Sequence, residues 1–350
     1  MRYPKNLPDR GTIGFVAPSF GCATEPYRSA FDNALDKWHK LGYKTIPGPN
    51  CYADEGVGIS NLPAKCAKEF TEMYCSKESD VLISCGGGEL MCEILPMVDF
   101  EILKSAEPKW FMGYSDNTNL TFTLATLADT ASIYGPCAAS FGMEPRHSSL
   151  EDARGILNGT VRKVSGYGMW EAESLKDAEH PLEPYHLTEA LQIRSFVGMQ
   201  EKSAELSDEN PLQFSGRLLG GCLDCLITLC GTRFDKVAEF VKKYSEDGIL
   251  WFLEACDLNV FSMRRAMWQL EQAGWFEHAK GFLIGRPANG QPMFNLDAYQ
   301  AILEVAGRKG IPVIMDIDLG HRPPMMPLIV GSYADICVTG NQITIQMNCR

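Results

Sequence analysis

The first 130 residues alternate short apolar runs with amphipathic stretches, and this alternation restricts the fold more than any other feature. An apolar run followed by a helical pattern and another apolar run is typical of a parallel sheet whose strands are joined by helices. The expected strands are TIGFVAPS (12–19), YKTIPGPN (43–50), DVLISCGGGE (80–89) and KWFMGYS (109–115). The expected helices lie within 25–42, 61–79 and 118–128, with patches of helix in 92–107.

Local signals sharpen two of these helices. Gly42 is expected to end the first helix, since glycine tolerates the backbone conformation that follows a helix. Asn61 is expected to cap the second, with Pro63 in its first turn. We therefore predict an α/β fold with a parallel sheet that has helices on both faces.

In such a sheet, ligands bind beyond the carboxyl ends of the strands. Three predicted turns lie at that edge: Pro18-Ser19, Gly86-Gly87-Gly88 and Ser115-Asp116.

The rest of the chain has a different character. Residues 145–215 are rich in charge, Gly and Pro with weak periodicity. Three apolar runs and two helical patterns follow, and a Gly340-Asn341 turn predicts a closing hairpin. We expect an N-terminal domain over 1–150, a linker and long loop near the active site over 151–215, and a C-terminal domain over 216–350. Expected strands there are 248–257, 279–287 and 311–321, and expected helices are 259–276 and 296–310.

Composition excludes several classes of function. The net charge is −12, which argues against nucleic-acid or anionic-membrane binding. There is no apolar run of 18 residues and no signal-peptide core at the N-terminus, so a cytoplasmic protein without a membrane span is expected. The 13 cysteines are an odd number, often within apolar runs, and favour reduced thiols. Cys222 and Cys225 form a CxxC, but no second pair or His cluster stands at zinc spacing, so no metal site is expected.

Ser115 allows two interpretations. It follows an apolar strand and precedes a helix, so it can be a helix cap or an exposed nucleophile with helix N–H groups nearby. The glycines at 86–88 are equally ambiguous: they form a tight turn, or they let the backbone approach an oxyanion or phosphate.

Two further residues end apolar strands. Glu254 closes ILWFL, where a buried carboxylate needs a partner. His321 closes PVIMDIDLG and is a candidate base or a structural histidine. Asp316 and Asp318 are rival acids, expected on one face of their strand because they are two residues apart.

Seven segments in order resemble the LD-carboxypeptidase family of serine peptidases over nearly the whole chain. They are GFVAPS, LISCGGGE, FMGYSDNT, GRLLGGCLDCL, ILWFLEACD, FLIGR and DLGHRPPMMPLIVG. The family has its nucleophile in GYSD, a glutamate ending an LFLE strand, and a histidine in a GH motif. The resemblance therefore implies a Ser115–Glu254–His321 triad.

The resemblance also implies the roles. His321 takes the Ser115 proton, and Glu254 holds the imidazole tautomer. The backbone N–H groups of Asp116 and of Gly87 or Gly88 form the oxyanion hole, with no metal or cofactor. The family's fold is a Rossmann-like N-terminal domain with a smaller β-rich α/β C-terminal domain, commonly in a homodimer.

Two substrates are compatible with the resemblance. One branch of the family removes the terminal D-alanine of muramyl tetrapeptides in cell-wall recycling. The microcin C immunity branch cleaves an aminoacyl-nucleotide amide and carries an aromatic residue that stacks on the base. Trp170 is the candidate platform here, with Tyr167 and Tyr185 as rivals. Arg217 and Arg322 are candidate carboxylate or phosphate partners, although a surface role is the simpler expectation for each.

Two departures weaken the nucleotide assignment. The family's frequent Asn after GG is Cys222 here, and Ala255-Cys256-Asp257 lacks the basic residues associated with that branch. A third hypothesis keeps Ser115 as a cap in a non-catalytic module that binds a nucleotide or peptide.

Overall fold

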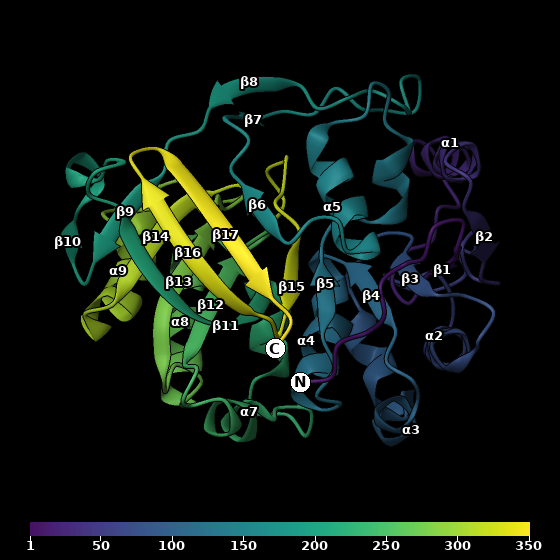
Figure 1. Ribbon diagram of the computed structural model, residues 1–350, viewed down its shortest axis with the longest axis horizontal. Helices are drawn as coiled ribbons and strands as arrows, with labels where there is room; N and C mark the ends of the chain where they lie inside the picture. The colour runs from purple at the N-terminus through teal and green to yellow at the C-terminus, as the bar shows by residue number, and fades with distance from the viewer. The chain divides into compact units, whose positions relative to one another are not determined.

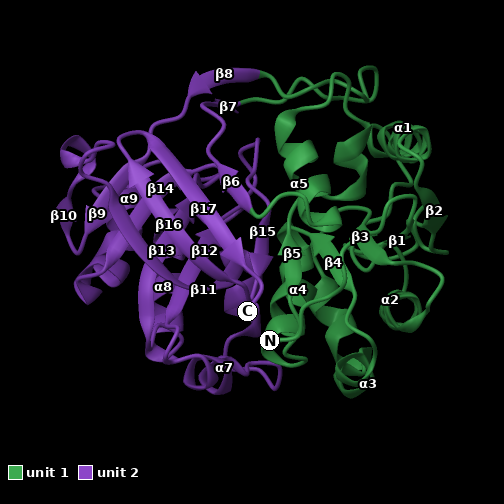
Figure 2. Cartoon of the chain, in the orientation of Figure 1, with its two compact units in different colours: residues 1–162, 173–186 green, residues 163–172, 187–350 purple.

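The computed structural model describes all residues, 1–350, and the chain folds into two compact units. Unit 1 comprises residues 1–162 and 173–186, and unit 2 comprises residues 163–172 and 187–350 (Figure 2). None of the helices is both long and apolar enough to cross a membrane.

Unit 1 contains the predicted parallel sheet. Strands β1 to β5 pair in the order β5-β4-β3-β1-β2, each parallel to its neighbour. Their bounds are β1 Thr12–Val16, β2 Lys44–Pro47, β3 Val81–Ser84, β4 Trp110–Gly113 and β5 Ser132–Tyr134. The strands β3, β4 and β5 are buried along their whole length, as expected for a sheet covered on both faces.

Helices cover both faces of this sheet. The chain reverses its direction of travel across the sheet after β2, so right-handed crossovers place α1 on one face and α2, α3 and α4 on the other. Figure 1 shows α5 on the same side as α1. The helices are α1 Tyr27–Lys40, α2 Pro63–Cys75, α3 Phe100–Ser105, α4 Thr118–Thr126 and α5 Ser148–Asn158, with 3-10 turns η1 Met91–Met97, η2 Ser115–Asn117 and η3 Ala138–Gly142.

The helix ends follow the sequence signals in part. Helix α1 buries Ala30, Phe31, Ala34 and Trp38, and Gly42 follows it at φ +90. Helix α2 begins at Pro63 as predicted, but the predicted Asn61 cap is wrong.

The residue at the N-cap of α2 is Leu62, and no side chain caps the helix. The amide group of Asn61 accepts from the Leu62 N–H and donates to Asn50 instead. The oxygen that could have capped the helix is therefore taken by the N–H of Leu62, the residue at the N-cap itself.

Unit 2 is built on a nine-stranded mixed sheet in the order β10-β9-β14-β13-β12-β11-β16-β17-β6. The central strands β11 to β14 are parallel, and the flanking strands are antiparallel. A separate pair is formed by β7 and β8. The bounds are β6 Lys163–Ser165, β7 Met169–Glu171, β8 Leu187–Ala190, β9 Arg194–Val197, β10 Gln200–Glu201, β11 Leu212–Cys222, β12 Ile249–Glu254, β13 Ala279–Gly285, β14 Pro312–Ile317, β15 Leu328–Val330, β16 Tyr333–Thr339 and β17 Gln342–Asn348.

Helices α8 and α9 pack together in unit 2, and α8 also contacts α6. The remaining elements are α6 Leu223–Leu229, α7 Val237–Lys243, α8 Val260–Gln272, α9 Ala298–Ala306, η4 Ser203–Glu205 and η5 Gly307–Lys309. The predicted Gly340-Asn341 turn joins β16 to β17 in an antiparallel hairpin, with Gly340 at φ +55. The two-unit α/β architecture, a parallel sheet followed by a β-rich mixed sheet, is the predicted fold class.

Candidate active site

Ser115 occupies a strained turn directly after β4. Its φ is +63, in the left-handed region that non-glycine residues rarely adopt. It is the first residue of η2, and the N-cap positions of η2 and α4 are Tyr114 and Asn117, neither of which makes a side-chain cap. Ser115 is therefore not a helix cap. Strain of this kind costs about 1–3 kcal/mol and collects at functional turns.

The glycine turn after β3 faces this serine. An ideal Cβ built on Gly87 would lie 3.0 Å from Cβ and 3.1 Å from Oγ of Ser115. The Asn117 side chain ties the two turns together by donating to the carbonyls of Gly86 and Tyr114, at 2.8 and 3.0 Å. Gly88 faces elsewhere, since a Cβ there would collide with Ser19 Oγ. A side chain at position 87 would therefore crowd Ser115, which would have to shift by a few tenths of an ångström.

Asp116 is buried beneath the turn. Its carboxylate accepts from Ser19 Oγ at 2.5 Å, from the Met91 N–H at 2.9 Å and from Asn119 Nδ2 at 2.9 Å. Burial raises the pKa of Asp116 to about 6, although these hydrogen bonds act in the opposite direction. The side chain therefore supports the turn from below.

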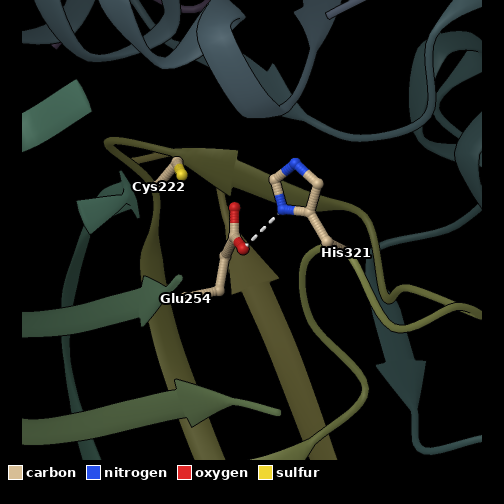
Figure 3. Close-up of side chains that lie close together, drawn as sticks. All are labelled: Cys222, Glu254 and His321. Atoms are coloured by element: carbon tan, nitrogen blue, oxygen red, sulfur yellow. Dashed lines mark hydrogen bonds and ion pairs between the residues drawn. The ribbon is translucent and has the colours of Figure 1, made fainter. Parts of the chain in front are cut away.

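Glu254 and His321 form a hydrogen-bonded pair at strand ends in unit 2. His321 Nδ1 lies 2.8 Å from Oε2 of Glu254, whose side chain is fully buried. Glu254 is the last residue of β12, and His321 follows β14 after a short turn. Figure 3 shows the other ring nitrogen, Nε2, pointing away from Glu254. The carboxylate thus fixes Nδ1 and leaves Nε2 for another partner.

The electrostatics of the pair favour a charged imidazole. Burial disfavours the imidazolium, but the Glu254 carboxylate and Cys256 together outweigh burial and hold the pKa of His321 well above its ordinary value. Such a ring can store a proton and is stabilised while it does so.

Cys222 is the third member of this cluster, and sequence reasoning placed no role on it. It is the last residue of β11 and lies opposite Glu254 in the parallel β11–β12 register. A hydrogen bond with the Cys225 thiol, together with burial and the nearby Glu254, raises the pKa of Cys222 well above that of a free thiol. The sequence did offer a signal for this proximity, because the neighbouring parallel strands β11 and β12 both end at the same edge of the sheet.

The rival acids of the sequence analysis have other partners. Tyr299 Oη donates to Asp316 at 2.5 Å, and Asp318 pairs with Arg286 at 2.5 Å. Their predicted position on one strand face is wrong. Asp316 has a left-handed φ of +62 and Asp318 lies beyond the end of β14, so the alternation of side chains is broken between them.

A pocket of about 600 Å³ lies in unit 2, and neither His321 nor Glu254 is among its lining residues. Trp170 lines it, half-buried, with the Arg286 guanidinium 5.0 Å from its ring centre. Arg322 also lines it and donates only to main-chain carbonyls, those of Ala172 and Ala288. The pocket therefore combines an aromatic face with a guanidinium that no carboxylate neutralises.

The other candidate substrate residues lie outside this pocket. Tyr167 and Tyr185 do not line it, and the Tyr185 ring packs edge-on against His147 in unit 1. The expected surface role of Arg217 is wrong, since it is only 4% exposed and forms an ion pair with Asp247. The local sequence around Arg217 does not reveal its burial, because its partner Asp247 lies 30 residues away along the chain.

The candidate residues divide between the units. Ser115, Gly87, Gly88 and Asp116 belong to unit 1. Glu254, His321, Trp170, Arg217 and Arg322 belong to unit 2.

A parallel α/β unit that carries a serine on a strained strand-to-helix turn, followed by a mixed β-rich unit, defines a two-domain α/β protein. The chain belongs to the LD-carboxypeptidase family of serine peptidases. The family's "LD-carboxypeptidase N-terminal domain" matches residues 13–135, and its "LD-carboxypeptidase C-terminal domain" matches residues 215–336.

Individual relatives match over the full length. The chain is 24% identical to the microcin C7 self-immunity protein MccF of Escherichia coli, covering 95% of this chain and 92% of that one. It is also 24% identical to a Streptomyces coelicolor protein named "Putative carboxypeptidase", covering 98% and 95%. Among solved structures, a MccF-like protein of Bacillus anthracis superposes with a TM-score of 0.81 at 20% identity, covering 99% of this chain and all of the other.

Proposed function

We propose that the protein is a serine hydrolase in which Ser115 is the nucleophile, His321 the general base and Glu254 the acid that orients it. The observation that carries the proposal is the Glu254–His321 hydrogen bond of 2.8 Å. With Nδ1 donating to the carboxylate, Nε2 accepts the Ser115 proton as Oγ attacks the substrate carbonyl. His321 then returns that proton to the leaving amine, and water hydrolyses the acyl-enzyme by the reverse route.

We propose that the oxyanion is held by the backbone N–H groups of Asp116 and Gly87. The crowding of Gly87 against the Ser115 hydroxyl supports this choice over Gly88, whose position faces Ser19. One such donor contributes about 3 kcal/mol to transition-state stabilisation.

The first substrate class is a peptide that ends in a D-amino acid joined through an L,D bond, as in muropeptides. A carboxypeptidase must hold the terminal carboxylate, and Arg322, next to His321 in the chain, is an arginine without a carboxylate partner. Cleavage is expected to release the terminal D-alanine from a muramyl tetrapeptide.

A second candidate is the amide of an aminoacyl-nucleotide toxin. Trp170 favours it, because a half-buried indole beside a guanidinium in an open pocket is suited to stacking on a base. One solved MccF structure, with a TM-score of 0.78, is described as a complex with glutamyl sulfamoyl guanosine. The exposed acidic Asp257, which follows the glutamate strand, works against a phosphate-like group there.

Purified full-length protein should be assayed on both substrates, muramyl tetrapeptide and aspartyl sulfamoyl adenosine, with Ser115→Ala as the inactive control. Release of D-alanine alone supports the carboxypeptidase assignment, and cleavage of the sulfamoyl amide alone supports the second candidate. If the unaltered protein binds a substrate without cleaving it, and Ser115→Ala binds equally well, the protein is a binding module and the hydrolase proposal is wrong.

We also propose a homodimer in the reducing cytoplasm. All 13 cysteines are free, many of them buried, which suits a compartment that keeps thiols reduced. The dimer rests on the family resemblance, and light scattering of the purified chain tests it: a monomer mass would refute it.

A further inference from the structure

Cys222, Glu254 and His321 form the one cluster of three metal-ligating side chains in the chain. One ligand atom from each lies within 4.8 Å of the others, and Figure 3 shows the sulfur and the ring on either side of the carboxylate. The Cys222 thiol also donates to the Asp224 carboxylate at 3.3 Å. A thiol, a carboxylate and an imidazole therefore lie together in this cluster.

The donor set points to one kind of cation. Thiolate, imidazole and carboxylate together are the ligands of Zn²⁺, whereas Mg²⁺ and Ca²⁺ require oxygen. Tetrahedral zinc with bonds of about 2.0–2.3 Å separates its ligand atoms by roughly 3.3–3.6 Å. The His321–Glu254 separation of 2.8 Å must widen slightly, and the ligand atoms, which now lie within 4.8 Å of one another, must draw together around the ion.

We propose that Cys222, Glu254 and His321 form an inhibitory zinc site within the acid–base pair. On binding, the Cys222 thiol proton passes to solvent and the imidazole proton moves from Nδ1 to Nε2, and Zn–S, Zn–N and Zn–O bonds replace the thiol S–H bond and the hydrogen bond between His321 and Glu254. Three protein ligands leave a fourth position for water. No electrons are transferred.

Zinc in this site stops the base from working. A cation on Nδ1 forces the remaining imidazole proton onto Nε2, and a protonated Nε2 cannot accept the serine proton. Inhibition therefore rests on the proposed function, whereas metal binding does not.

The first test is a Co²⁺ titration of the metal-free full-length chain, because tetrahedral cobalt bound to a thiolate absorbs strongly in the near-ultraviolet and visible. We expect saturation at one equivalent and displacement by Zn²⁺. Cys222→Ser should remove the thiolate band and weaken cobalt affinity by at least about a hundredfold, since even loss of an outer-shell partner costs 10–100-fold. His321→Ala, which leaves β11 intact, is the second variant and should weaken affinity similarly.

Cys337→Ser is the matched control. Cys337 pairs with Gln213, nine residues before Cys222 on β11, and thus lies roughly 30 Å away. It should keep the cobalt spectrum. A thiolate band that survives in Cys222→Ser, or a spectrum without such a band in the unaltered chain, overturns the site.

The second test measures hydrolysis with and without micromolar Zn²⁺. Unaltered protein should lose activity and recover it with EDTA, and in Cys222→Ser the half-inhibitory zinc concentration should rise at least about a hundredfold. Equal zinc sensitivity in both proteins overturns the inhibitory site. If neither substrate is cleaved, the proposed function fails while the cobalt spectrum still decides the metal site.

Discussion

Gly320 and Glu254 leave no room for a side chain between them. An ideal Cβ on Gly320 would lie 2.5 Å from Oε2 of Glu254, the oxygen that accepts from His321. Gly320 also has φ +90, a conformation that favours glycine. The glycine therefore brings the backbone before His321 against the carboxylate.

Gly320→Ala should displace Glu254 or His321 while leaving both present. We expect a loss of kcat/KM of at least about tenfold and a fall in unfolding free energy of about 1–3 kcal/mol from strain and crowding. Urea unfolding and steady-state kinetics measure the two effects. Full activity in this variant would contradict the proposed role of the pair.

The backbone strain at Ser115 should be measurable as a difference in unfolding free energy between two variants at this position. Ser115→Gly and Ser115→Ala both remove the hydroxyl, but only glycine relaxes at φ +63. Ser115→Gly should be more stable than Ser115→Ala by about 1 kcal/mol, from the usual cost of a left-handed residue. Calorimetry of the two inactive variants tests this, and equal melting temperatures would argue against a strained turn.

Glu254→Gln should change the pH dependence of both folding and catalysis. Because the pKa of His321 is raised above its ordinary 6.5, the charged ring stabilises the fold below that pH, and this contribution is lost as pH rises through the folded pKa. In Glu254→Gln the unfolding free energy should fall less with rising pH. The acidic side of the pH profile of kcat/KM should move to lower pH, and the maximum value of kcat/KM should be smaller. An unchanged acidic side of the kcat/KM profile would show that Glu254 does not control the pKa of His321.

Asp116 should also make the unfolding free energy fall as pH rises, but over a lower pH range than His321. Its pKa is raised to about 6, so the protonated form stabilises the fold below about pH 4, and that stability is lost as pH rises through about 6. The loss should be roughly 1–3 kcal/mol. The test measures the unfolding free energy of the unaltered chain and of Asp116→Asn from pH 4 to 7. The decrease with rising pH should be smaller in Asp116→Asn by this amount.

Trp170 separates the two substrate classes. Trp170→Ala should raise KM for an aminoacyl sulfamoyl adenosine by about 5–150-fold, the equivalent of about 1–3 kcal/mol of stacking. Trp170→Phe should retain part of the affinity. A matched control is Tyr185→Ala, which alters an aromatic residue outside the pocket. Equal effects of both alanine variants would remove Trp170 from base recognition.

The fold was predictable because its signals are local. Apolar runs of four to six residues with helical patterns between them gave β1 to β4 and α1, α2 and α4, and Gly42 and Gly340 marked turns through their backbone freedom. Asn61 is not a cap because its side-chain oxygen accepts from the adjacent Leu62 N–H, while its NH2 group donates to Asn50, 11 positions away.

The site was predictable to a lesser degree. Residue pattern alone left Glu254, Asp316 and Asp318 as equal acids for His321, and the family resemblance chose among them. The left-handed φ of Asp316 and the burial of Arg217 depend on tertiary partners, which no local pattern encodes. The contact of Cys222 with Glu254 follows from strand register, which only the sheet order fixes.

The polypeptide passes from one unit to the other three times, after residues 162, 172 and 186. No single cut of the gene can therefore separate the two halves cleanly. A fragment ending at residue 162 lacks the 14 residues that complete unit 1, and one starting at residue 187 lacks the ten that carry Trp170. Any attempt to evolve, swap or express one half alone must carry part of the other with it.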